Sequence, residues 1–236
     1  MTTQTPAADQ PSGEHPPHGY TLWAVLRRDP HHAAITSPDA VAELESALAA
    51  VQAGGGVTVR GLYDVSGFKA DADLMIWLHG PRAEELQAAL RELRRTEMLR
   101  TLLPTWNTMG MHRDAEFNAR HVPAFLRGVE PAEWITVYPF VRTHQWYLLP
   151  EDERRTMLAD HGRRGAKFTG VLTNTVAAFA LGDYEWILPL EADTLEDLVD
   201  LMRDLRYTEA RRYVHLETPF YTGRRIDAAA LAEVLA

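Results

Sequence analysis

Residues 93–97, LRRTE, recur 112 positions later as residues 205–209, LRYTE. The same offset aligns the apolar run 74–78, LMIWL, with residues 186–190, WILPL. It also superimposes the apolar positions of one amphipathic segment on those of another, carrying Leu86, Leu90 and Leu93 onto Leu198, Met202 and Leu205. Agreement in pattern and order over about thirty residues indicates an internal duplication, which decides the architecture before any single element does.

Each copy predicts the order β–α–β–β–α–β. In the first copy we expect strands at 20–28, 57–66, 72–79 and 104–113, with helices at 38–53 and 81–101. In the second copy we expect strands at 134–143, 168–179, 184–191 and 212–223, with helices at 150–161 and 194–209. Two such ferredoxin-like repeats in one chain predict an α+β fold, a dimeric α+β barrel with its helices outside.

The repeat also sets the expected domain boundaries. Residues 20–113 form the N-terminal ferredoxin-like half, residues 134–225 form the C-terminal half, and residues 114–133 connect them. Residues 1–19 are polar and contain no apolar segment of a signal peptide, so we expect a disordered tail. Residues 226–236 are expected to be a C-terminal tail. A barrel of this kind does not by itself specify a reaction.

Composition excludes several classes of site. The chain has 236 residues and no Cys, so disulfides, iron–sulfur clusters, Cys-bound zinc and thiolate-bound haem are excluded. A metal must be held by carboxylates, Tyr or one of ten His. The net charge is −9 and no basic tract is present, which disfavours nucleic acid as a partner. No apolar run approaches the roughly 20 residues of a membrane span, so we expect a cytoplasmic protein.

His161 is the first candidate site residue. It lies near the end of the expected helix 150–161, and Met157 precedes it by one turn on the same helix face. A neutral imidazole there could bind iron through one nitrogen and donate a hydrogen bond through the other. The ordinary alternative is a His that interacts with the carbonyl end of a helix. Taken alone, the residue favours this alternative.

Tyr138 is the second candidate, in the expected strand 134–143. Strand alternation puts Tyr138, Phe140 and Arg142 on one side of the sheet. An inward Tyr with a cation beside it suits a pocket for an anionic aromatic ligand. A core Tyr with an edge Arg is the commoner arrangement, and Trp146, which follows, is an ordinary candidate for packing.

Together these segments resemble a known family. Residues 138–142, YPFVR, then Trp146, then residues 160–165, DHGRRG, resemble the coproheme decarboxylases of actinobacterial type, within the chlorite-dismutase superfamily. Residues 182–186, GDYEW, and 205–209, LRYTE, continue the resemblance in order. It extends over about residues 20–225 and is densest in the second half.

The resemblance implies roles for particular residues. His161 matches the ligand of the porphyrin iron, and Tyr138 matches the catalytic tyrosine. His121, in residues 120–123, RHVP, matches a distal His that acts as acid and base toward peroxide. Arg142 and Arg206 fall at basic positions near the porphyrin propionates, with Trp146 in the same binding region. The porphyrin is expected in the second-half barrel.

One position departs from the family pattern. Chlorite dismutases have a distal Arg at the place that aligns with Asn174, and residues 170–176 contain no Arg, which disfavours chlorite chemistry. Many coproheme decarboxylases have Gln there. Asn174 is therefore expected to be a weaker propionate contact.

The implied reaction converts iron coproporphyrin III to haem b. Hydrogen peroxide is the co-substrate, two propionates become vinyl groups through a three-propionate intermediate, and the reaction ends coproporphyrin-dependent haem biosynthesis. The resemblance further implies a homopentamer and a transient contact with ferrochelatase. Other interpretations remain open: a haem peroxidase of the same superfamily, a haem carrier or sensor, and a cofactor-free oxygenase on the same fold.

Overall fold

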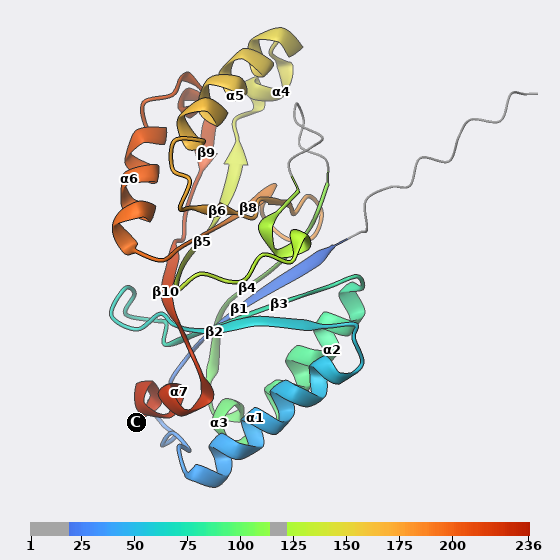
Figure 1. Ribbon diagram of the computed structural model, residues 1–236, viewed down its shortest axis with the longest axis vertical. Coiled ribbons are helices and arrows are strands. Elements are labelled where there is room, and N and C mark those ends of the chain that lie inside the picture. The colour runs from blue at the N-terminus through green and yellow to red at the C-terminus, as the bar shows by residue number, and fades with distance from the viewer. Residues whose placement is uncertain (1–18, 114–121) are drawn as a thin grey trace, which may run out of the picture.

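The computed structural model describes residues 19–113 and 122–236 (Figure 1). The first half is built from strands and helices in the order β1 Tyr20–Arg27, α1 Pro38–Ala53, β2 Thr58–Asp64, β3 Leu74–Gly80, α2 Ala83–Leu93, α3 Glu97–Arg100 and β4 Leu103–Met111. A short 3-10 turn, η1 Ala124–Arg127, lies in the connection to the second half. The tail expected at 1–19 lies, apart from its last residue, outside the described residues.

The second half follows the same order with more interruptions. Its elements are β5 Trp134–Arg142, α4 His144–Leu148, α5 Glu151–Gly165, β6 Leu172–Thr173, β7 Val176–Ala177, β8 Trp186–Ala192, α6 Leu195–Leu205, η2 Glu209–Tyr213, β9 Val214–Leu216 and β10 Tyr221–Ile226, before a last helix, α7 Ala228–Leu235.

Eight of the strands close into an antiparallel ring. The order around it is β8-β7-β4-β1-β3-β2-β10-β5, and the β5–β8 pairing closes it. Within each half the strand order is that of a ferredoxin-like fold, β4-β1-β3-β2 in the first and β10-β5-β8-β7 in the second. The expected α+β barrel of two ferredoxin-like repeats is confirmed.

The 112-residue offset holds at the level of elements. It carries β3 onto β8 and α2 onto α6 with both ends of each element in register. Trp77 and Pro189 therefore lie at equivalent positions of equivalent strands, as the repeat predicted. Helices α2 and α6 have the same apolar stripe in the two copies, because in each half this stripe packs on the sheet.

Several expected elements differ in extent. The helix expected at 81–101 is two helices, because the chain turns after Leu93 before α3 begins at Glu97. The strand expected at 168–179 is reduced to β6 and β7, and the one expected at 212–223 is divided into β9 and β10. The helix expected to end at His161 continues to Gly165.

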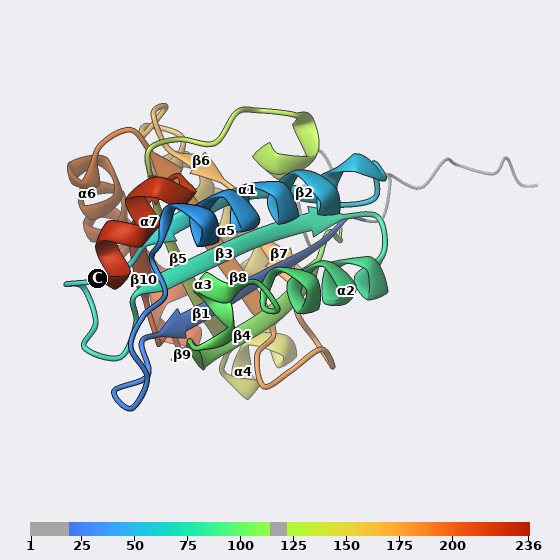
Figure 2. The same cartoon turned by 90° about the horizontal axis from the view of Figure 1, so that it is seen from below.

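The segment 226–236 is not a tail. It contains α7, which begins after Asp227, whose side chain accepts a hydrogen bond from the Ala230 N–H at 2.8 Å. Leu231 and Leu235 are buried in the outer core of the first half. Figure 2 shows α7 beside α1, with α1 and α2 covering the outer face of the first-half strands. The apolar pattern of this segment is too short to distinguish a helix from a tail.

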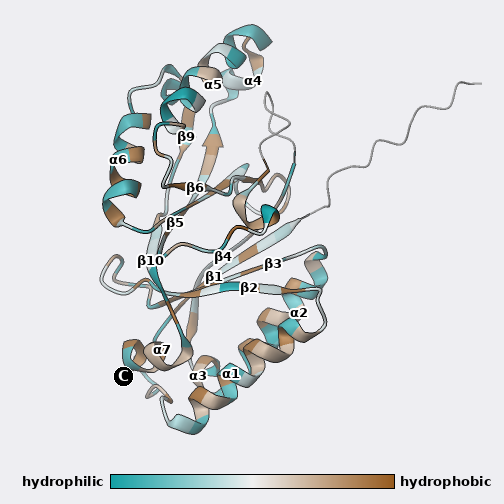
Figure 3. Cartoon of the chain, viewed as in Figure 1, coloured by the Kyte–Doolittle hydropathy of each residue, from teal (hydrophilic) through white to brown (hydrophobic). Residues whose placement is uncertain are grey.

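Three apolar clusters fill the molecule. One lies between the first-half sheet and its helices, a second fills the barrel interior, and a third lies between the second-half sheet and α6. α5 is different from the other long helices, because none of its residues is buried. Figure 3 shows hydrophilic residues recurring along it. Among the described residues, no helix combines the length and the apolar character needed to cross a membrane.

Candidate functional site

Tyr138 faces the helix layer of the second half. Strand β5 sends Ile135 and Val137 into the barrel interior, whereas Tyr138 packs in the outer cluster with Leu198 and Leu201 of α6. Our expectation of an inward Tyr in a pocket inside the barrel is therefore wrong for this side chain. The candidate site lies on the outer face of the second-half sheet, toward α5 and α6.

The Tyr138 phenol is almost fully enclosed. Its ring stacks on Phe220, with centroids 4.4 Å apart and an angle of 18° between the planes. Its hydroxyl donates to the Met202 sulfur at 3.5 Å, a weak acceptor. Burial, and then the nearby Glu217 carboxylate, raise the pKa of Tyr138 well above its usual value. The phenol therefore keeps its proton at neutral pH.

Two Arg side chains converge on Glu217 next to this phenol. Arg206, at the end of α6, and Arg211, in η2, both donate to the same Glu217 oxygen. Arg206 is partly exposed, so part of its guanidinium is accessible from outside. Arg206, one of the expected basic residues, therefore lies beside Tyr138, and its charge is paired with the Glu217 carboxylate.

Arg142 lies at the end of β5 and contacts two aromatic rings. Its guanidinium carbon is 4.0 Å from the ring centroid of Trp146 and 4.6 Å from that of Phe140. Such stacking is a favourable cation–π arrangement. Nη1 also donates to the Ala210 carbonyl at 3.1 Å. Trp146 is buried, so it fixes the plane on which Arg142 rests.

Glu185 is a residue of this region whose role the sequence did not indicate. Its Oε2 accepts from the Arg142 backbone N–H at 2.8 Å and from the Tyr147 hydroxyl at 2.6 Å. These bonds tie the end of β5 and helix α4 to the start of β8. The GDYEW motif contained the residue, but only the fold brings it to Arg142.

His161 projects from α5 five residues before the helix C-cap at Ala166. It is therefore not the residue that caps the helix, which weakens the ordinary alternative. Partial burial of the ring, and then the Arg142 charge, lower the pKa of His161, whereas Asp160 and Glu217 oppose the shift. The ring is thus neutral near pH 7 and has the lone pair that a metal requires.

Tyr138 and His161 share one electrostatic neighbour, Glu217. Glu217 acts on the pKa of both residues, and Arg142 acts on that of His161. The site therefore offers a neutral imidazole from the helix layer, a protonated phenol from the sheet, and cations at its edge. These groups fit an iron porphyrin with carboxylate substituents, which needs one axial nitrogen ligand and cations for its carboxylates.

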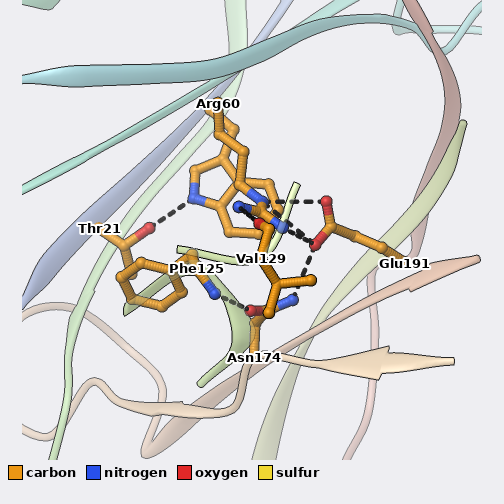
Figure 4. A network of polar contacts seen from close by, with 7 residues as sticks. Thr21, Arg60, Phe125, Val129, Asn174 and Glu191 are labelled. Carbon is orange, nitrogen blue, oxygen red and sulfur yellow. Dashed lines mark hydrogen bonds and ion pairs between the residues drawn. The ribbon is translucent and has the colours of Figure 1, made fainter. Parts of the chain in front are cut away.

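Asn174 lies elsewhere, in a buried polar network inside the barrel (Figure 4). Its Oδ1 accepts from the Phe125 N–H at 2.9 Å and its Nδ2 donates to Glu191 at 3.0 Å. Glu191 also accepts from Arg60 of β2 at 2.7 Å. Both ends of the amide are committed to this network, so the expected propionate contact of Asn174 is withdrawn.

The same network joins the two halves and the connector. Arg60 comes from the first half and Glu191 from the second, and Arg60 Nη1 donates to the Val129 carbonyl at 3.0 Å. His121, the expected acid and base, lies outside the described residues.

Comparison with known proteins identifies the relatives of this chain. Residues 37–226 match the family model described as chlorite dismutase. A coproheme decarboxylase of Mycolicibacterium smegmatis is 56% identical over 177 residues, which are 75% of this chain and 77% of the relative. The chlorite dismutase of Candidatus Nitrospira defluvii, solved in complex with imidazole, superimposes with a TM-score of 0.79 at 20% identity, covering 92% of this chain and 94% of that one. A second solved structure, of a protein assigned as a chlorite dismutase, superimposes with a TM-score of 0.80 at 20% identity, covering 93% of this chain and 99% of that one. At this identity the two structures show the fold alone.

Proposed function

This chain belongs to the chlorite dismutase family, and from that premise we propose that it is a coproheme decarboxylase, an enzyme that converts iron coproporphyrin III to haem b. The observation that carries the proposal is its 56% identity to a coproheme decarboxylase over three quarters of the chain. The same relationship favours this reaction over a haem peroxidase, a carrier or a sensor.

The iron porphyrin is both the substrate and the redox centre, and hydrogen peroxide is the oxidant. Each propionate loses a hydrogen atom, then carbon dioxide and a second electron, and becomes a vinyl group. One peroxide accepts the two electrons. The cycle runs twice, by way of a three-propionate porphyrin, so the chain must position two propionates in turn.

His161 is proposed to bind the iron. Its support is a neutral imidazole on a helix that has no buried side chains, next to Arg142. Partial burial first, and the positive Arg142 second, keep the ring deprotonated and so available as a ligand.

Tyr138 is proposed to be the group that attacks the propionate. Because burial keeps the phenol protonated, its one-electron oxidation releases a proton, and the tyrosyl radical can then remove a hydrogen atom from the β-carbon. His121 is proposed to move the proton of the peroxide, as general acid–base catalysis requires.

Arg142 and Arg206 are proposed to hold propionates, with Trp146 supporting Arg142. Four carboxylates on one apolar macrocycle need cationic partners when they are taken out of water. Arg206 is already paired with Glu217, so a propionate must compete with that carboxylate or share the cation with it.

The remaining features of the proposal concern the whole protein. We propose a homo-oligomer, a pentamer by resemblance, that works in the cytoplasm and makes transient contact with ferrochelatase. We also propose the two halves 20–113 and 134–225 as its units of organisation, with 114–133 between them and residues 1–19 as a tail.

Mass spectrometry of the porphyrin tests the reaction directly. Purified protein is incubated with coproheme and small additions of hydrogen peroxide, and the pigments are separated. We expect a three-propionate porphyrin to rise and fall as haem b accumulates. Coproheme that is bleached or unchanged, with no vinyl product, would contradict the proposal.

A further inference from the structure

The hydroxyl of Tyr138 is held by a sulfur atom. It donates to Met202 Sδ of α6 at 3.5 Å, inside the apolar cluster between the second-half sheet and that helix. Within residues 19–113 and 122–236, this is the hydrogen bond that the hydroxyl makes. Tyr138 is only 3% exposed, so solvent offers little alternative. A buried hydroxyl without an acceptor is unfavourable, so Met202 has a polar task in an apolar layer.

The duplication shows that packing alone does not require this pair. The 112-residue offset relates Met202 to Leu90. Tyr138 and Ala24 occupy the same register in their halves, because their partner residues on β8 and β3 differ by the same offset. Ala24 and Leu90 pack in the outer core of the first half. One copy therefore has two hydrocarbon side chains where the other has a hydroxyl and a thioether in contact.

A thioether is a suitable partner for a phenol that must be oxidised. Sulfur is a weak and polarisable acceptor, so it sets the direction of the O–H bond but holds the proton less strongly than a carbonyl or carboxylate oxygen would. It is also not a base, so it does not take the proton when the phenol loses an electron. Met202 can therefore orient Tyr138, but it cannot serve as a catalytic acid or base.

Helix α6 carries a second group of the site one turn further on. Arg206 follows Met202 by four residues, so the two side chains lie on the same face of the helix end. Arg206 donates to Glu217, beside the phenol. The helix is anchored to the sheet by Leu198 and Leu201, which are buried. Its packing therefore fixes the place of the sulfur and of the guanidinium together.

Building on the proposed reaction of Tyr138, we propose that Met202 is a positioning residue that fixes the direction of the Tyr138 hydroxyl. The sulfur holds the O–H bond toward α6, so the phenol has one orientation before each hydrogen transfer. Without the sulfur, the O–H bond would populate both of its in-plane directions, and fewer encounters with a propionate would be productive. Loss of the sulfur should therefore slow the formation of vinyl groups without weakening the binding of coproheme.

Selenium NMR of the porphyrin-free chain tests the hydrogen bond without any turnover. Methionine is replaced biosynthetically by isotope-enriched selenomethionine, and the resonance of residue 202 is assigned by its absence in Met202→Leu. We expect this resonance to differ between water and heavy water, because the donated hydrogen exchanges for deuterium. Tyr138→Phe should remove the difference, whereas Tyr184→Phe, at a Tyr that packs on the barrel-interior cluster, should leave it. A resonance insensitive to heavy water, or a difference that survives Tyr138→Phe, would overturn the proposal.

Turnover of coproheme separates positioning from packing. Met202→Leu introduces the side chain that the first copy has and nearly conserves the volume. Coproheme affinity, measured by absorption titration, should be unchanged, and vinyl formation should slow by about two- to tenfold, as expected for the loss of one hydrogen bond. Met98→Leu, at a buried Met of the first-half core, is the control and should keep the parental rate.

Two results of this experiment are decisive in different ways. A parental rate of vinyl formation in Met202→Leu would overturn the positioning role. A parent chain that forms no vinyl group would overturn the proposed reaction, and with it the role of Met202, while the selenium measurement would still decide whether the hydrogen bond exists.

Discussion

The chemistry of the site depends on two side chains whose protonation is set by their surroundings. Burial keeps the Tyr138 phenol protonated and partial burial keeps the His161 imidazole neutral, because each charged form would lose solvation. Arg142 acts in the same direction on His161. The proposed radical step requires a protonated phenol. The proposed bond to iron requires a lone pair on the imidazole.

The ligand role of His161 makes a spectroscopic prediction. His161→Ala removes the nitrogen that is proposed to bind the iron, so the change of the Soret band on adding coproheme should be lost or altered in position, and binding should weaken. Absorption titration measures both. His144→Ala, at an exposed His of the neighbouring helix α4, is the matched control. A parental spectrum from the His161 variant would show that another group holds the iron.

At the scale of elements, the duplication made most of the fold predictable. Helices α2 and α6 repeat one apolar stripe, and β3 and β8 repeat one buried run, so both pairs could be located from the offset. The interruption between β6 and β7 could not be predicted from the offset. Asn174 lies in it, and the amide of Asn174 contacts Glu191, which lies 17 residues further along the chain.

Strand alternation likewise predicted only part of the site. It placed Phe140 and Arg142 on one side of β5, and the contact between them confirms this. Which side faces the helices depends on how the sheet closes, so the inward direction expected for Tyr138 was wrong. Glu185 and Glu217 were missed because their partners are brought to them by tertiary contacts alone.

Helix α7 makes a prediction about stability. Leu231 is fully buried against the first-half helices, so Leu231→Ala should lower the free energy of unfolding by about 2–5 kcal/mol. Urea unfolding followed by circular dichroism measures the change. Leu148→Ala is the control, since Leu148 is 84% exposed and its loss should cost less than about 0.5 kcal/mol. Equal effects of the two variants would mean that α7 does not pack as described.

At the scale of the whole molecule, the halves are joined inside the barrel by the buried pair of Arg60 and Glu191. Removing one charge leaves the other buried without its partner. Glu191→Leu should therefore cost about 3–5 kcal/mol of stability. Arg60→Met with Glu191→Leu should recover much of this loss, because no charge then remains unpaired. If the double variant loses as much stability as the two single variants together, the buried pair of Arg60 and Glu191 does not join the halves in this way.

His79 makes the stability depend on pH. Burial, and then the Arg60 charge, lower its pKa from 6.5 to about 4. Between these two pKa values the unfolded chain protonates His79 and the folded chain does not. The contribution of neutral His79 to the free energy of unfolding is therefore complete above pH 6.5 and is lost as the pH falls toward 4. The slope should approach about 1.4 kcal/mol per pH unit at most. Urea unfolding measured across this pH range should show that the free energy of unfolding depends less steeply on pH in His79→Gln. If the pH dependence is unchanged in this variant, groups other than His79 cause it.

The most direct test of the central claim compares haem b yield in the parent protein and in Tyr138→Phe. Phe keeps the ring that stacks on Phe220 but removes the oxidisable hydroxyl, so coproheme binding, checked first by titration, should be retained. Peroxide should then consume porphyrin without forming either vinyl group. If Tyr138→Phe binds coproheme and makes haem b at the parental rate, Tyr138 is not the radical that attacks the propionates.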